Sequence, residues 1–123
     1  MEETLFLFMS ASPVKSPERC ATPFYMASVA AALEYRTIMA LQMDAVRLFV
    51  PGTADGFAAL PGGRPIIDFI RDAASAGAEL YVCSGSLVAQ GIDEADLIPE
   101  CAGAVGAAWM IEEAGAADLV ISY

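Results

Sequence analysis

Short apolar runs alternate along the chain with longer stretches in which apolar residues recur at helical spacing. This pattern is typical of strands alternating with helices. Residues 5–9 are continuously apolar, as expected of a strand that is buried on both faces of a parallel sheet. Further strands are predicted at residues 44–50, 79–83, 101–105 and 119–121.

Helices are predicted between these strands. Thr22 and Pro23 are typical of a helix start, with the threonine hydroxyl as N-cap and proline at the first helical position. This helix is expected to extend to about residue 39, because no glycine or proline ends it earlier. An amphipathic helix begins at Ile66 and is closed by Gly77. Two shorter helices are predicted at residues 84–90 and 107–114.

The alternation of strands and helices predicts one α/β domain over residues 1–123, in which helices cover both faces of a parallel sheet. Right-handed crossovers place every loop from a strand to a helix at the carboxyl ends of the strands. Ligand sites of open α/β sheets lie at that edge. The loops at residues 10–22 and 51–65 are therefore expected beside the loop that follows Cys83.

The composition excludes several functional classes. Sixteen acidic residues against six basic ones give a net charge of −10, which disfavours nucleic acid as a partner. The chain has no histidine, so Ser-His-Asp catalysis, Cys-His catalysis and histidine-ligated metal sites are excluded. Glycine-rich phosphate-binding motifs are also missing. We therefore expect neither a metal nor a cofactor.

The mean hydropathy of +0.54 raises the question of a membrane protein. A spanning helix needs about 20 consecutive apolar residues, and the most apolar stretch ends at Glu34 and Arg36. The acidic start of the chain is unlike a signal peptide. The sequence therefore predicts a cytoplasmic protein that does not bind membranes. So few charges on so small a domain also predict a homo-oligomer.

The cysteines Cys20, Cys83 and Cys101 form no Cys-x-x-Cys pair, and we expect them to be reduced thiols. Cys83 ends a predicted strand and is followed at once by Ser84, Gly85, Ser86 and a helix. Unpaired backbone N–H groups and the helix dipole at this position favour a thiolate. The alternative interpretation is a small buried apolar residue that ends a strand.

The loops expected beside Cys83 carry Lys15, Arg19 and Arg64, which are half of the chain's six cations. A cation near Cys83 stabilises a thiolate or a persulfide. The alternative is that these are ordinary solvated loop charges. Cys20 lies in the first of these loops and is either a second thiol within reach of Cys83 or a loop cysteine without a role.

The segment Leu80-Tyr81-Val82-Cys83-Ser84-Gly85-Ser86-Leu87-Val88-Ala89-Gln90-Gly91-Ile92, followed by Asp96-Leu97-Ile98-Pro99, resembles the DsrE/DsrF-like family of sulfur-relay proteins. The likeness extends over nearly the whole chain. It implies a three-layer α/β/α sandwich on a mostly parallel sheet of about five strands, assembled as trimers or hexamers.

The resemblance also implies a function. In the sulfur-relay members, the cysteine that matches Cys83 accepts sulfane sulfur as a persulfide and passes it to a partner. The expected partners are therefore a sulfur donor protein and a sulfur acceptor protein. Some members have a second cysteine three residues further on, where this chain has Ser86. The alternative is a non-catalytic subunit or a small-ligand-binding module in which Cys83 is inert.

Overall fold

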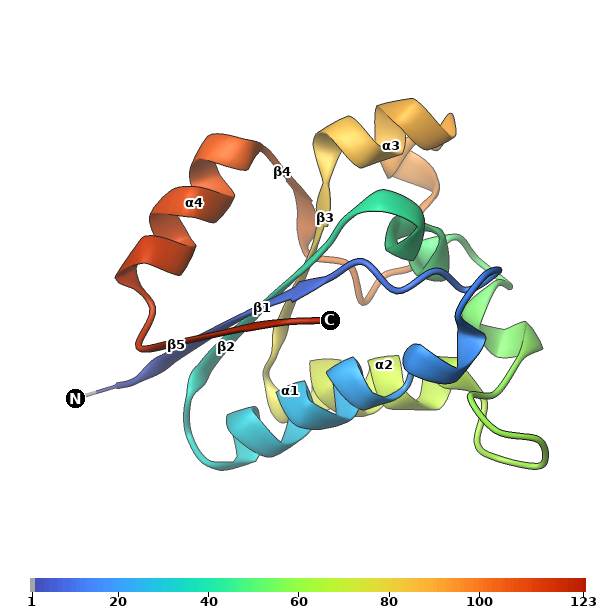
Figure 1. The fold of residues 1–123 in the computed structure, drawn as a ribbon, viewed down its shortest axis with the longest axis horizontal. Coiled ribbons are helices and arrows are strands. Elements are labelled where there is room, and N and C mark those ends of the chain that lie inside the picture. The colour runs from blue at the N-terminus through green and yellow to red at the C-terminus, as the bar shows by residue number, and fades with distance from the viewer. Residues whose placement is uncertain (1) are drawn as a thin grey trace.

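A five-stranded parallel sheet forms the centre of the protein in a computed structural model that describes residues 2–123 (Figure 1). Its order is β4-β3-β2-β1-β5, and every neighbouring pair is parallel. The strands are β1 (Thr4–Met9), β2 (Arg36–Leu41), β3 (Glu79–Cys83), β4 (Gly103–Val105) and β5 (Leu119–Ser122).

Helices cover the two faces of the sheet. In Figure 1, α1 (Thr22–Ala32) and α2 (Ile66–Ala76) lie side by side on one face, and α4 (Ala107–Ala116) lies on the other. The short helix α3 (Ser84–Gln90) follows β3 directly and packs on the 3-10 helix η2 (Met43–Phe49). The three-layer α/β/α fold predicted from the sequence is therefore confirmed. Shorter 3-10 helices are η1 (Pro17–Arg19), η3 (Ala54–Gly56) and η4 (Glu94–Asp96).

None of the helices in residues 2–123 combines the length and apolar character that are needed to cross a bilayer.

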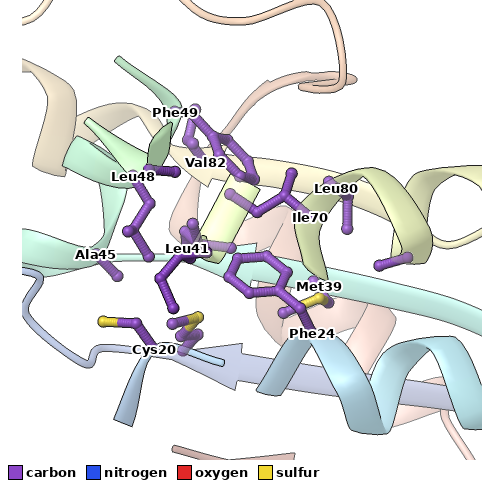
Figure 2. Packing of buried hydrophobic residues seen from close by; sticks show 14 of the residues in the cluster. Cys20, Phe24, Met39, Leu41, Ala45, Leu48, Phe49, Ile70, Leu80 and Val82 are labelled. Atoms are coloured by element: carbon purple, nitrogen blue, oxygen red, sulfur yellow. The ribbon is translucent and has the colours of Figure 1, made fainter. Parts of the chain in front are cut away.

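Alternate side chains of the strands enter two separate apolar clusters. The larger cluster fills the space between the sheet and the helices α1 and α2, where Phe24, Met39 and Ile70 are fully buried (Figure 2). The smaller cluster lies on the α4 face around Phe6 and Met110. Cys83 packs against this smaller cluster, so its side chain stands on the α4 side of the sheet.

The prediction that the first helix extends to about residue 39 is wrong, because α1 ends at Ala32. Two backbone bonds of 3.0 Å close its end, from the N–H of Tyr35 to the carbonyl of Ala30 and from the N–H of Glu34 to that of Ala31. This is a Schellman ending, in which the residue after the cap is left-handed. Glu34 takes that conformation, with φ of 70°. Glycine usually occupies this position, and because this chain has glutamate there, the sequence does not indicate that the helix ends.

The strand predicted at residues 44–50 is also wrong. The chain forms β2 earlier, at Arg36–Leu41, and residues 43–49 form η2. The buried residues of η2 are Ala45, Val46, Leu48 and Phe49. Buried positions three and four residues apart are the spacing of a helix, whereas a strand buried on one face alternates. Asp44, which the prediction placed at the start of a strand, therefore lies after β2, at the carboxyl edge of the sheet.

Two helix ends differ from the predictions by a few residues. The N-cap of α1 is Ala21, and Thr22 is already helical and forms no capping bond. Gly115 lies inside α4, which continues to Ala116. The predicted end of α2 at Gly77 is confirmed, because this glycine adopts φ of 105°.

Candidate functional site

A pocket of about 590 Å³ lies where β1, β2 and β3 end, at the edge where the fold predicts a ligand site. We call it the Cys83 pocket. Each strand contributes the residues that follow it. The lining residues are Ser10, Ser12 and Lys15 after β1, Met43 and Asp44 after β2, and Cys83, Gly85, Ser86, Ala89 and Gln90 at and after the end of β3.

Cys83 is half-buried and forms the N-cap of α3, with an extended backbone. Its sulfur lies over the first turn of that helix, because a Cβ atom built on Gly85 would lie 3.9 Å from Sγ. The first N–H groups of a helix have no partners within the helix. Cys83 thus lines the pocket, and its sulfur lies beside the helix turn whose backbone donors are not used within the helix.

A hydrogen bond joins α3 to the segment after β2. The backbone N–H of Met43 donates to Oγ of Ser86 at 2.8 Å. Met43 has φ of 56°, a left-handed conformation that is uncommon for residues other than glycine, asparagine and aspartate. Its side chain is 64% exposed although it is large and apolar. Strained residues of this kind cluster at ligand sites, which makes the Cys83 pocket a functional candidate on backbone evidence alone.

Asp44 also lines the pocket and links two of its segments through hydrogen bonds. Its carboxylate accepts a 2.8 Å hydrogen bond from Oγ of Ser12 and a 3.0 Å bond from the side-chain amide of Gln90. The Ser12 bond is the main reason why the pKa of Asp44 is lowered, and burial opposes the shift, while the charges of Arg47 and Lys15 assist it. Oγ of Ser12 also accepts the backbone N–H of Lys15 at 3.0 Å. Asp44 therefore fixes the backbone of the loop that carries Lys15.

The three predicted cations lie in different places. Lys15 lines the Cys83 pocket. Arg64 lines another pocket, of about 320 Å³, where its guanidinium pairs with Asp72 at 2.9 Å and lies 4.8 Å from the ring centre of Phe69. Arg19 is exposed in η1 and is not among the residues that line the Cys83 pocket. Only Lys15 among the three is thus brought to Cys83.

The other two cysteines lie away from the Cys83 pocket. Cys20 is fully buried in the larger cluster (Figure 2), and its thiol is 3.6 Å from the carbonyl oxygen of Ser16. Burial, with the nearby charge of Glu18, raises the pKa of Cys20 to about 11. Burial likewise raises the pKa of the half-buried Cys101. Neither cysteine lines the pocket that holds Cys83. Within residues 2–123, no group of acidic or cysteine side chains is arranged to hold a metal ion.

The sequence reasoning missed Met43, Asp44 and Gln90 as site residues. Met43 and Asp44 were missed because the second strand was placed too late, which put them before a strand and away from the carboxyl edge. A signal was present, since residues 38–41 are a continuous apolar run like that of β1. The role of Gln90 depends on contacts between segments far apart in the chain, and no local pattern indicates it.

The sequence matches the DsrE/DsrF-like family over residues 4–123. The fold is similar to that of the ychN protein from E. coli, with a TM-score of 0.82 at 17% identity over 98% of this chain and 99% of that one. It is also similar to MTH1491 from Methanobacterium thermoautotrophicum, with a TM-score of 0.67 at 14% identity over 100% of both chains. No curated protein matches. The family resemblance predicted from the sequence is confirmed, and the two solved structures support the fold.

Proposed function

Because the chain belongs to the DsrE/DsrF-like family, we propose that it is a sulfur-relay protein, which carries sulfane sulfur as a persulfide on Cys83 and passes it to a partner protein. One observation carries this proposal. Cys83 lines a pocket together with Lys15, and its sulfur lies over the first turn of α3, whereas Cys20 is fully buried.

The proposed reaction consists of two thiol exchanges without net oxidation. The Cys83 thiolate attacks the outer sulfur of a persulfide on the donor protein. The sulfur–sulfur bond of the donor breaks, the donor leaves as a thiolate, and Cys83 now carries the outer sulfur. A thiolate of the acceptor protein then attacks that outer sulfur, and Cys83 leaves as a thiolate. No cofactor is required.

The side chains and amides around Cys83 are suited to holding the persulfide anion. The amides of Ser84, Gly85 and Ser86 are first-turn donors, which favour a negative charge. Lys15 contributes a cation to the lining of the same pocket. Ser86 occupies the position three residues after Cys83, so a disulfide cannot form between these two positions. We assign no part in the site to Arg19, Arg64 or Cys20, since other places in the fold hold them.

The test is the intact mass of the protein after exposure to a sulfane-sulfur donor. We expect a gain of about 32 Da per sulfur atom accepted. The gain is expected in the wild type and in the matched variants Cys20→Ser and Cys101→Ser, and not in Cys83→Ser. An adduct that persists in Cys83→Ser excludes Cys83 as the acceptor. A wild type that gains no mass favours an inert subunit or a small-ligand-binding module.

We further propose that the protein is a homo-oligomer, as a trimer or a hexamer. Large apolar side chains are exposed on several elements, including Val88 on α3, Ile111 on α4 and Val120 on the edge strand β5. Large apolar side chains left exposed on a single chain are covered when they lie in an interface between subunits, where apolar patches commonly occur. Light scattering or native mass spectrometry is expected to give three or six times the 12.9 kDa of one chain. A mass of one chain contradicts this proposal.

A further inference from the structure

A second pocket, of about 440 Å³, adjoins the Cys83 pocket. Its lining is mostly apolar, with Val14, Val50, Phe57 and Ile92, and Arg47 is its charged residue. We call it the Arg47 pocket. Gln90 lines both pockets. An apolar pocket with few polar groups is the usual form of a site for a small organic molecule.

The wall between the two pockets is a chain of polar contacts. Nε of Arg47 donates to Oε1 of Gln90 at 2.7 Å and lies 3.6 Å from the carboxylate of Asp44. The amide of Gln90 in turn donates to Asp44. Within residues 2–123, the hydrogen bond that Arg47 donates comes from Nε, and no hydrogen bond comes from its two terminal nitrogens, which are thus available to a ligand. Two such nitrogens match the geometry of a carboxylate.

The charge of the lining points to the same class of ligand. The chain as a whole has a net charge of −10. The residues that line the two pockets include the cations Lys15 and Arg47 and the single acid Asp44. Asp44 is occupied by hydrogen bonds from Ser12 and Gln90. An anionic group is therefore attracted to this edge in spite of the charge of the whole protein.

The two pockets meet at Gln90, at the end of α3, and Cys83 lies at the start of that helix. Cys83 precedes α3 and Gln90 is its last residue, so the helix separates them. At about 1.5 Å per residue, the distance along this helix is roughly 10 Å.

We propose that the Arg47 pocket binds the apolar, carboxylate-bearing end of a small organic sulfur compound whose sulfur end reaches Cys83. This inference adds a small organic persulfide as a sulfur donor beside the donor protein, and it rests on the proposed function for the sulfur chemistry. The Cys83 thiolate attacks the outer sulfur, the sulfur–sulfur bond of the compound breaks, and the compound leaves as a thiolate. The binding step itself depends on Val14, Phe57 and Arg47 and requires no reaction at Cys83.

The test is a titration of the ¹⁵N-labelled protein with 3-phenylpropanoate, an apolar carboxylate without sulfur, followed by NMR. We expect the amides of Thr53, Phe57 and Ile92 to shift, with a dissociation constant of about 1–10 mM, as is usual for a fragment of this size. The uncharged 3-phenylpropanamide is expected to bind at least about threefold more weakly, because it lacks the charge that pairs with Arg47.

Two variants of the Arg47 pocket and one matched control test the residues that bind the acid. Arg47→Gln is expected to remove the preference for the acid over the amide, whereas the matched variant Arg71→Gln keeps it, since Arg71 pairs with Glu100 and lines neither pocket. Val14→Asp places a negative charge in the pocket at a side chain that is 69% exposed, so the fold is not at risk. It is expected to weaken binding of the acid at least about threefold.

The outcomes separate the two proposals. Equal binding of acid and amide by the wild type, or shifts that lie outside the Arg47 pocket, overturn the inference even when Cys83 accepts sulfur. If the acid binds as expected while Cys83 accepts no sulfur, the pocket stands as a site for an organic anion and the relay function fails.

Discussion

The hydroxyl of Ser86 accepts the backbone N–H of Met43 at 2.8 Å, which ties the first turn of α3 to the segment that follows β2. These residues are 43 positions apart in the chain. Met43, whose backbone is left-handed, lines the Cys83 pocket. The geometry around Cys83 therefore depends on a contact between two crossovers of the sheet.

Replacing Ser86 tests this contact. Ser86→Ala removes the acceptor of the Met43 N–H, and we expect the free energy of unfolding to fall by about 1 kcal/mol, the usual net value of such a bond. Urea denaturation measures this change. The control is Ser75→Ala, at an exposed position within α2. An equal effect of the two variants would show that the bond contributes nothing specific.

Gly85→Ala tests the space above the thiol. The new Cβ would lie 3.9 Å from Sγ of Cys83, an ordinary van der Waals contact, so we expect the variant to fold. An outer sulfur on Cys83 needs the space that the methyl group fills, so sulfur loading is expected to slow about tenfold, which corresponds to roughly 1.4 kcal/mol in the barrier. Time-resolved intact mass measures the loading.

The control for this variant is Gly106→Ala, where a Cβ meets nothing within 4 Å. It is expected to load sulfur at the wild-type rate. Unchanged loading in Gly85→Ala would place the outer sulfur elsewhere than above the first turn of α3.

The thiols of Cys83 and Cys20 are expected to differ in their reactivity. Cys83 is half-buried and lines a pocket, whereas Cys20 is fully buried with a pKa of about 11. At pH 8 only about 0.1% of a thiol with that pKa is ionised. We expect iodoacetamide to label Cys83 at least about tenfold faster than Cys20 in the folded protein, as measured by peptide mass spectrometry. Denatured protein is the control, in which the two rates converge. Faster labelling of Cys20 in the folded state contradicts the structure.

Asp44 gives the stability a defined pH dependence. Its pKa in the folded protein lies below the ordinary value of 3.8, chiefly because Ser12 donates to its carboxylate. A lowered pKa contributes stability at pH values above the unfolded pKa, and this contribution is lost as the pH falls through the folded pKa. We therefore expect Asp44→Asn to destabilise the protein at neutral pH, and the difference from the wild type to shrink below about pH 4.

Urea denaturation at several pH values measures this difference. Asp55→Asn, which changes an exposed carboxylate in η3, is the control and is expected to show little pH-dependent difference. A difference for Asp44→Asn that stays constant down to about pH 3 would mean that its carboxylate charge has no part in stability.

Glu34→Gly is expected to stabilise the protein. Glu34 has φ of 70°, which costs a residue with a side chain roughly 1–2 kcal/mol, and part of the gain is lost to the greater freedom of glycine in the unfolded chain. We expect a net gain of about 0.5–1 kcal/mol in the free energy of unfolding, measured in urea. Gly77→Ala, at φ of 105°, is the matched reverse change and is expected to destabilise. A loss of stability in Glu34→Gly contradicts this account.

The elements that the sequence predicted correctly are those whose structure depends on neighbouring residues alone. Residues 5–9 are apolar at every position, which a strand buried on both faces requires, and this strand is β1. The helices α2 and α3 end where Gly77 and Gly91 adopt left-handed conformations. In each case the structure of the element depends on a few neighbouring residues, so the residue types alone are enough to predict it.

The elements that the sequence did not predict depend on tertiary context. The end of α1 rests on Glu34, which accepts a left-handed backbone that its residue type disfavours. Residues 38–41 are a short apolar run, and residues 45–49 are a similar run that Arg47 interrupts. Only the pairing of residues 38–41 with β1 and β3 makes them the strand. Because β2 ends at Leu41, Met43 and Asp44 follow the strand and lie at the carboxyl edge, where they belong to the candidate site.

The sequence by itself determined the order of most elements, the parallel α/β architecture and the place of Cys83 at the end of a strand, because these follow from local apolar patterns and turn residues. Only the tertiary structure decided which groups surround that thiol. It brought Lys15, Asp44 and Gln90 to it from three separate crossovers, buried Cys20 and held Arg64 elsewhere. The physical reason is that contacts between distant segments depend on strand order and packing, which no local pattern encodes.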